Sequence, residues 1–207
     1  MGVEVRRIGE PQVLPHAVLI VDYFHVVQLA NRAVTEVRRR MTLTQRGRRG
    51  RGTDPEWRMR NRLTRSAARM PGHHVDRLVD ALQALPAAIG APILAAWNAK
   101  EDLLDLLATA RTRPDREHVH QLLHRFYTRC AASDLPELHR LATTIETWWP
   151  HIHAFLTTGI TSAGSEGTNR VIKAIARDAY GFRNPDNQRL RTRTATTRRH
   201  RGHLNPA

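Results

Sequence analysis

The chain has 207 residues, of which 33 are Lys or Arg and 19 are Asp or Glu, so its formal net charge at pH 7 is +14. This charge disfavours basic partners and favours a polyanion, with nucleic acid ahead of an anionic membrane. The hydrophobic fraction of 41% is sufficient for a core. The length fits one domain, or one domain that carries a large insertion.

The compartment is predicted from what the sequence lacks. Cys130 is the single cysteine, which excludes an internal disulfide and the cysteine-rich zinc modules. No apolar run is long enough for a transmembrane helix. The segment Met1–Gln12 carries charges but no apolar core of a signal peptide. We therefore expect a cytoplasmic protein with no membrane partner.

The clearest strand signal is the apolar run Ala17–Val21, which ends at Asp22. A short continuous apolar run is typical of a strand that is buried on both faces. An acid at the carboxyl end of such a strand lies where open α/β sheets hold their ligands. Capping of the next helix explains Asp22 equally well, because apolar residues repeat at helical spacing from Phe24 to Arg40.

The middle of the chain, residues 41–158, is predicted to be mostly helical. Residues 41–54 mix three glycines with several arginines and indicate a flexible basic loop. A basic helix is expected from Pro55 to about Met70. The apolar spacing then predicts further helices near residues 78–85, 93–107 and 115–131, and one from Asp134 onward that Pro150 should kink or break.

A helix is predicted again over residues 165–178, with charged and apolar residues on opposite sides. Glu166, Asn169, Lys173 and Arg177 are spaced by three, four and four residues, which places them on one face. A carboxylate, an amide and two cations in line suit a metal ion and a phosphate backbone. A solvated charged face is the alternative. We expect this helix to stop at Tyr180-Gly181. The tail from Arg189 carries arginines and no acid, and we expect it to fray beyond about Thr196.

Two segments together resemble insertion-sequence transposases of the ISL-three type, which belong to the DDE superfamily and have an RNase H-like fold. The first is LPHAVLIVDYFHVVQLAN over Leu14–Asn31. The second is SAGSEGTNRVIKAIAR over Ser162–Arg177, followed by YGFRNPDN over Tyr180–Asn187. The string WNAKE at Trp97–Glu101 is also similar. The resemblance covers roughly residues 14–195.

The resemblance implies a reaction and a metal. The reaction is DNA strand cleavage and transfer by phosphoryl transfer, assisted by Mg²⁺ or Mn²⁺ held by carboxylates. Asp22 would be the second catalytic, metal-binding acid and Glu166 the third. DNA is the implied partner, and self-association into a homo-oligomer stays open.

The resemblance and the charge pattern also nominate residues that contact DNA. His25 would be the histidine of the D-x-x-H pattern found in several such transposases. An aromatic residue of the insertion would stack on an unpaired base, with Trp97, Trp148 and Trp149 as candidates and core packing as the favoured explanation of each. The full set of predicted DNA-contacting residues is His25, Asn169, Lys173, Arg177, Arg48, Arg49, Arg51 and Trp97.

One feature departs from the family pattern, which has a first aspartate three strands and a helix upstream of Asp22. The 21 residues before Asp22 contain no aspartate, only Glu4 and Glu10. At about 3.3 Å per residue they are too few for three strands and a helix. We therefore expect a mostly α protein with a partial α/β element, an incomplete RNase H-like fold with a large helical insertion, from a transposase fragment that is inactive alone. A non-catalytic, basic, helical nucleic-acid-binding protein is the alternative.

Four parts are expected along the chain. They are a truncated RNase H-like part at 1–40, a helical insertion with a basic loop at 41–158, the glutamate helix at 159–188, and a basic tail at 189–207.

Overall fold

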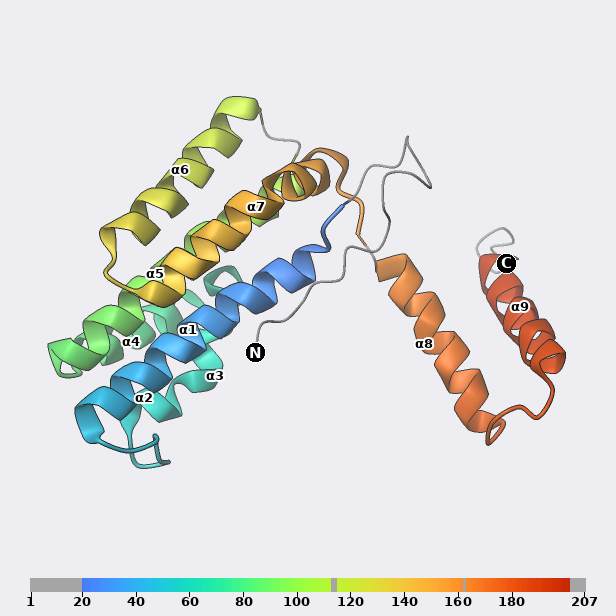
Figure 1. Ribbon diagram of the computed structural model, residues 1–207, viewed down its shortest axis with the longest axis horizontal. Helices are drawn as coiled ribbons and strands as arrows, with labels where there is room; N and C mark the ends of the chain where they lie inside the picture. Colours follow the sequence, from blue (N-terminus) through green and yellow to red (C-terminus); the bar gives the residue numbers. More distant parts are fainter. Residues whose placement is uncertain (1–19, 113–114, 162, 202–207) are drawn as a thin grey trace. The chain divides into compact units, whose positions relative to one another are not determined.

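The computed structural model describes residues 20–112, 115–161 and 163–201. Every regular element within these residues is a helix (Figure 1). The chain divides into two compact units, Met1–Ile160 and Thr161–Ala207, and each is described here by itself. None of the described helices is long and apolar enough to span a bilayer.

Unit 1 is a bundle of long helices with several short helical elements between them. Its elements are α1 (Tyr23–Arg46), α2 (Pro55–Arg58), α3 (Arg60–Leu63), the 3-10 turn η1 (Ala67–Arg69), α4 (Gly72–Gln83), α5 (Ala87–Ala108), the 3-10 turn η2 (Thr109–Arg111), α6 (Arg116–Ala132) and α7 (Pro136–Thr158). Unit 2 consists of α8 (Ala163–Asp178) and α9 (Pro185–Arg201).

Helix α5 forms the centre of the unit 1 core. Its apolar residues point in several directions, and Ile93, Ala96, Leu103 and Leu106 are fully buried. A helix that is apolar on more than one side needs neighbours on each of them. Helices α1, α4 and α6 all pack against α5, and α1 also packs against α7.

Helix α1 has a capping residue at each end. The Asp22 side chain accepts a hydrogen bond from the Phe24 backbone N–H at 3.1 Å, which caps the first turn. Gly47 ends the helix with φ of 62°, a left-handed conformation that glycine adopts without strain. The helix therefore runs six residues beyond the predicted end at Arg40, and shortens the predicted loop.

The predicted strand is not formed in the part of it that the structure describes. Ile20 and Val21 belong to no strand, and residues 17–19 lie outside the described range. The backbone N–H of Val21 donates to the carbonyl oxygen of His151 on α7 at 3.4 Å, so its hydrogen bond goes to a helix. The mostly α class is confirmed for the described residues, and no α/β element is found among them.

The basic helix predicted from Pro55 to Met70 is instead three short elements, α2, α3 and η1. Contacts with α5 replace part of the expected helical hydrogen bonding. The Lys100 side chain donates to the carbonyl oxygen of Arg65 at 2.6 Å. The Glu101 carboxylate accepts from the Ala67 backbone N–H at 2.9 Å. These bonds satisfy backbone groups that a continuous helix would have paired internally.

Helix α7 continues through Pro150, contrary to the prediction of a break. Proline removes one backbone donor, and buried apolar side chains on both sides of it, Ile145 and Ile152, hold the two halves against the core. The helix starts at Pro136 instead of Asp134, because proline suits the first helical turn.

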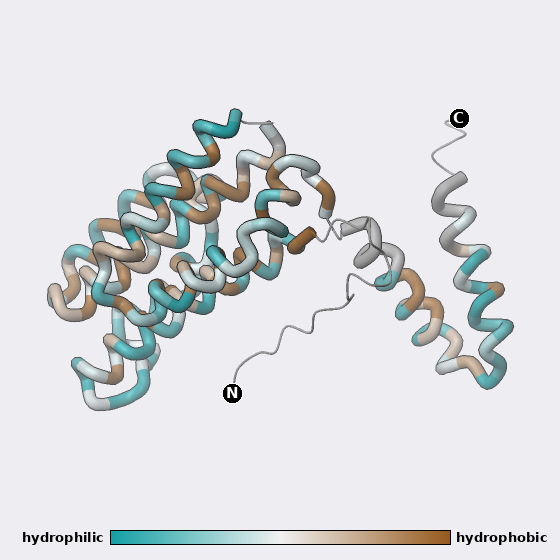
Figure 2. Tube along the Cα trace, turned by 45° about the horizontal axis from the view of Figure 1, so that its top comes forward, coloured by the Kyte–Doolittle hydropathy of each residue, from teal (hydrophilic) through white to brown (hydrophobic). Residues whose placement is uncertain are grey.

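Unit 2 contains the turn that was predicted after the glutamate helix. Gly181 has φ of 88°, and its backbone N–H donates to the Ala176 carbonyl oxygen at 2.9 Å, which closes the end of α8. The segment beyond Pro185 is helical as far as Arg201, whereas the sequence predicts fraying beyond Thr196. Figure 2 shows that polar residues cover most of α9.

Candidate nucleic-acid interface and metal-binding acids

Asp22 stands at the start of α1 with a defined structural role. It is half-buried, and its carboxylate caps the helix through the Phe24 N–H. The capping explanation of this residue is therefore confirmed, and metal binding stays a prediction. His25 is exposed on the first turn of α1, and its backbone N–H donates to the Asp22 carbonyl oxygen at 3.0 Å.

The predicted polar face of α8 gathers three of its four residues around a hollow of about 360 Å³. Its lining residues are Asn169, Arg170, Lys173 and Arg177. Arg170 was missed by the sequence reasoning, although it lies three residues before Lys173 and seven before Arg177, spacings that share a helical face. Glu166 belongs to the same helix, and its side chain lies outside the described set.

The two predicted metal-binding acids belong to different units, Asp22 to unit 1 and Glu166 to unit 2. Among the residues whose side chains are described, no group of three or more His, Cys, Asp and Glu residues is placed to hold a metal ion.

In the predicted flexible basic loop, Asp54 forms hydrogen bonds with the arginines around it. Arg48 donates two hydrogen bonds to Asp54, at 2.7 and 2.8 Å, so its charge is already paired. Asp54 also accepts from the Arg51 backbone N–H at 2.7 Å. These hydrogen bonds, that of Arg48 first, hold the pKa of the buried Asp54 carboxyl well below its usual range. The side chains of Arg49 and Arg51 are exposed.

A second buried acid, Glu56, pairs with an arginine in the same region. Glu56 is fully buried, and Arg46 donates to its two oxygens at 2.6 and 3.1 Å. Burial raises the pKa of Glu56, but the Arg46 hydrogen bond and charge oppose burial and the net pKa is lowered. On the following turn, the Arg60 guanidinium lies 3.5 Å from the centroid of the Trp57 ring, a cation–π contact.

The WNAKE segment has a structural role. Lys100 is fully buried, and its ammonium lies 2.5 Å from the Glu101 carboxylate as well as bonding to the Arg65 carbonyl. Burial lowers the pKa of Lys100, and the hydrogen bond and charge of Glu101 partly offset this. Sequence reasoning missed Lys100, although an isolated lysine in an apolar helical segment was a usable signal.

Trp97 is 95% buried in the core of unit 1. This burial contradicts the prediction that Trp97 contacts DNA, because a ring that stacks on a base must be accessible. Core packing decided its position, since Trp97 lies on the buried side of the central helix α5. Trp148 and Trp149 are partly buried and lie beside His151 and His153.

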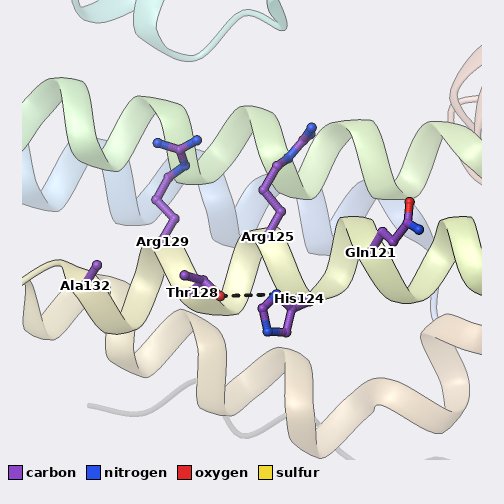
Figure 3. Close-up of a pocket in the computed structure, with 6 residues that line it drawn as sticks. All are labelled: Gln121, His124, Arg125, Thr128, Arg129 and Ala132. Carbon is purple, nitrogen blue, oxygen red and sulfur yellow. Dashed lines mark hydrogen bonds between the residues drawn. The ribbon is translucent and has the colours of Figure 1, made fainter.

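Helix α6 carries another basic face, which lines a pocket of about 480 Å³ (Figure 3). Arg125 and Arg129 extend from this face, and both pair with Asp102. Arg125 also reaches Asp105 at 2.7 Å. These arginines are already paired, so the pocket offers less positive charge than its residue types suggest.

The comparisons with known proteins agree with the sequence pattern. The chain matches the ISL-three-type DDE family, described as a transposase, over residues 11–192. Because this match covers most of the chain, the protein belongs to that transposase family. No curated protein and no solved structure matched the chain.

Proposed function

We propose that this protein takes part in metal-dependent cleavage and transfer of DNA strands, as part of an RNase H-like catalytic domain. The observation that carries the proposal is the family match over residues 11–192, which spans both acid-bearing segments. The net charge of +14 supports a nucleic-acid substrate, because a DNA backbone attracts a strongly basic protein.

Asp22 and Glu166 are the proposed metal ligands. Carboxylate oxygens are the donors that Mg²⁺ prefers, so both residues fit the ion by their chemistry. A bound Mg²⁺ or Mn²⁺ would supply activation of the attacking oxygen and stabilisation of the leaving oxygen. The helix cap at Phe24 fixes the direction of the Asp22 carboxylate, which helps to hold a ligand in place.

The polar face of α8 is proposed to hold the DNA backbone. Lys173 offers a compact charge and Arg177 a planar fork that matches two phosphate oxygens, while Asn169 supplies an amide donor. The hollow that these side chains share with Arg170 supports a common ligand. The exposed Arg49 and Arg51 would add charge from unit 1, whereas Arg48 is already paired with Asp54.

Two acids of the expected three are assigned, and we propose that the chain by itself binds metal and DNA without cutting DNA. The metal site is tested by thermal unfolding of the 207-residue chain with Mg²⁺ or Mn²⁺. A ligand present at a hundred times its dissociation constant stabilises a protein by about 2.7 kcal/mol. We expect such a gain for the wild type, and its loss in Asp22→Asn and in Glu166→Gln.

The matched control is Glu117→Gln, an exposed acid on α6, which should keep the full metal response. The absence of any metal effect on the wild type would refute the metal site and leave the alternative of a non-catalytic nucleic-acid-binding protein. Cleavage of a labelled duplex by the wild-type chain would contradict the expected inactivity.

A further inference from the structure

Arg38 on α1 is buried in a way that neither the fold nor the proposed metal site explains. Only 5% of the residue is exposed. Its guanidinium makes no hydrogen bond or ion pair with any residue in the described part of the chain. Cationic side chains are rarely buried unless an anion accompanies them. A buried arginine whose guanidinium has no protein partner is therefore a candidate binding group for an anion from solution.

The groups around Arg38 are mostly of the same sign. Arg39 and Arg60 are near enough for their charges to oppose that of Arg38, and Glu56 alone opposes this effect. Both carboxylate oxygens of Glu56 already accept hydrogen bonds from Arg46. Burial first, and then the two arginines, lower the pKa of Arg38. Two further guanidinium charges thus act on Arg38, while the one acid that acts on it, Glu56, is paired with Arg46.

Arg60 is positioned without being neutralised. Its guanidinium stacks on the Trp57 ring at 3.5 Å and donates to the Trp57 carbonyl oxygen at 3.1 Å. Neither contact supplies a negative charge. The nitrogen atoms of Arg38 are not among the polar side-chain atoms that are both fully buried and without a partner, so they reach solvent. The Arg38 guanidinium is therefore accessible from solution, and Arg60 is half-buried.

The positive surface continues from α3 toward α4. His74 has a lowered pKa, caused first by burial and then by the charges of His73, Arg77, Arg62 and Arg65. No acid is among these causes. Lys100 holds the backbone at Arg65, so this part of the surface is fixed to the core.

We propose that Arg38 and Arg60 form a site for one phosphate of a DNA backbone. Arginine forks suit phosphate because two parallel N–H donors match two of its oxygens. Arg62 in α3 and Arg65 just after it are exposed and would add positive charge for neighbouring phosphates. The choice of DNA as the source of the phosphate rests on the proposed function, while the anion site itself rests on the burial of Arg38.

The anion site is tested by thermal unfolding with and without inorganic phosphate. Phosphate should raise the Tm of the wild type. Arg38→Met should reduce this response, of which the proposed phosphate contacts on α8 keep a part, and should itself raise the Tm without phosphate, because an apolar chain of similar length replaces a buried charge that has no acidic partner. Arg32→Met is the matched control, an exposed arginine of α1 paired with Glu36, and it should respond like the wild type. A wild type that does not respond, or an Arg38→Met variant that responds as strongly as the wild type, would overturn the site.

DNA binding is tested by measuring the binding constant of a short labelled duplex by fluorescence anisotropy at several salt concentrations. Each phosphate contact contributes about −0.9 to the slope of log K against log salt, so Arg38→Met should make the slope shallower by about that amount. Arg60→Gln, on a half-buried residue, provides a second variant with the same expected loss. A phosphate response with unchanged DNA binding would mean an adventitious ion only, and would overturn the proposal.

The two proposals can fail separately. If the wild type shows no metal response, the metal site is refuted. If Arg38→Met binds DNA more weakly than the wild type, the phosphate site is supported, whatever the result for the metal. A wild type that responds to phosphate but binds no DNA would overturn the DNA occupant and count equally against the proposed function.

Discussion

Two buried cations of unit 1, Lys100 and Arg38, differ in whether the surrounding residues neutralise their charge. Lys100 has a carboxylate at 2.5 Å and a backbone carbonyl at 2.6 Å, so its burial is compensated and it ties α5 to the segment before η1. Arg38 has neither kind of partner among the described residues. Lys100 is therefore a structural residue, whereas Arg38 is the proposed anion-binding residue.

Gly90 allows α5 to approach α4 closely. A Cβ on this residue would collide with the carbonyl oxygen of Leu82 and would lie 3.1 Å from the Leu85 Cβ. Alanine favours a helix over glycine by about 1 kcal/mol, but overpacking against backbone typically costs about 1–3 kcal/mol. We therefore expect Gly90→Ala to lower the free energy of unfolding, as measured by urea denaturation.

Gly72→Ala is the control for this prediction, because a Cβ at the start of α4 meets nothing within 4 Å. It should leave the stability unchanged or slightly raised. Equal stability of the two variants would show that α4 can move away from α5 at little cost.

At the scale of elements, one ion pair joins the first helix of unit 1 to the last. Arg40 on α1 donates to both oxygens of Glu137 on α7, at 2.7 and 2.9 Å. The Arg40 hydrogen bond is the main cause of the lowered pKa of Glu137, and the charge of Arg40 adds to it. Since the folded state holds this carboxyl in its charged form, protonation must weaken the contact between α1 and α7.

The sign of the pH effect follows from the lowered pKa. The contribution of Glu137 is fully present above its unfolded pKa near 4.5 and is lost as the pH falls through the lower folded value. Hydrogen bonds to charged groups contribute about 1.5–3 kcal/mol, with less expected here because Arg40 is partly exposed. Glu137→Gln should lower stability at neutral pH and flatten the loss of stability below pH 4.5.

The measurement is the Tm as a function of pH. Glu146→Gln is the control, an exposed acid on the same helix, and its profile should follow the wild type. An acid limb of unchanged steepness in Glu137→Gln would contradict the assignment.

At the scale of the whole molecule, the two units differ in how their helices are stabilised. Unit 1 buries apolar side chains from α1, α4, α5, α6 and α7 in one core. In unit 2, α9 exposes Leu190, and the arginines of α9 whose side chains are described, Arg189, Arg191 and Arg193, are exposed as well. Its Asp186–Arg189 pair is also exposed and adds little stability. A helix as rich in arginine as α9 gains little stability from its own sequence, because like charges on one helix repel one another.

Hydrogen exchange should therefore separate the units. We expect the backbone amides of α9 to exchange about a thousandfold or more faster than those of α5, which lie in the core. Addition of DNA should slow the exchange of α9 if its arginines contact phosphates. Equal protection of α5 and α9 in the free protein would show that α9 has a stabilising partner.

The sequence by itself determined the features that depend on near neighbours. Helical spacing located the polar face of α8, Gly181 marked the end of that helix, and Asp22 marked the start of α1. The charge of the chain and the two acid-bearing segments likewise pointed to a transposase family, which the match confirms. These signals are readable because caps and faces involve residues only a few positions apart.

The tertiary structure decided which charges remain available and where helices break. Arg48 is paired with Asp54, Trp97 is buried in the core, and Arg38 is enclosed beside an acid already bound to Arg46. Lys100 breaks the predicted helix from a position 35 residues along the chain. Burial and ion pairing depend on side chains brought together from distant positions, so residue type and local spacing do not specify them.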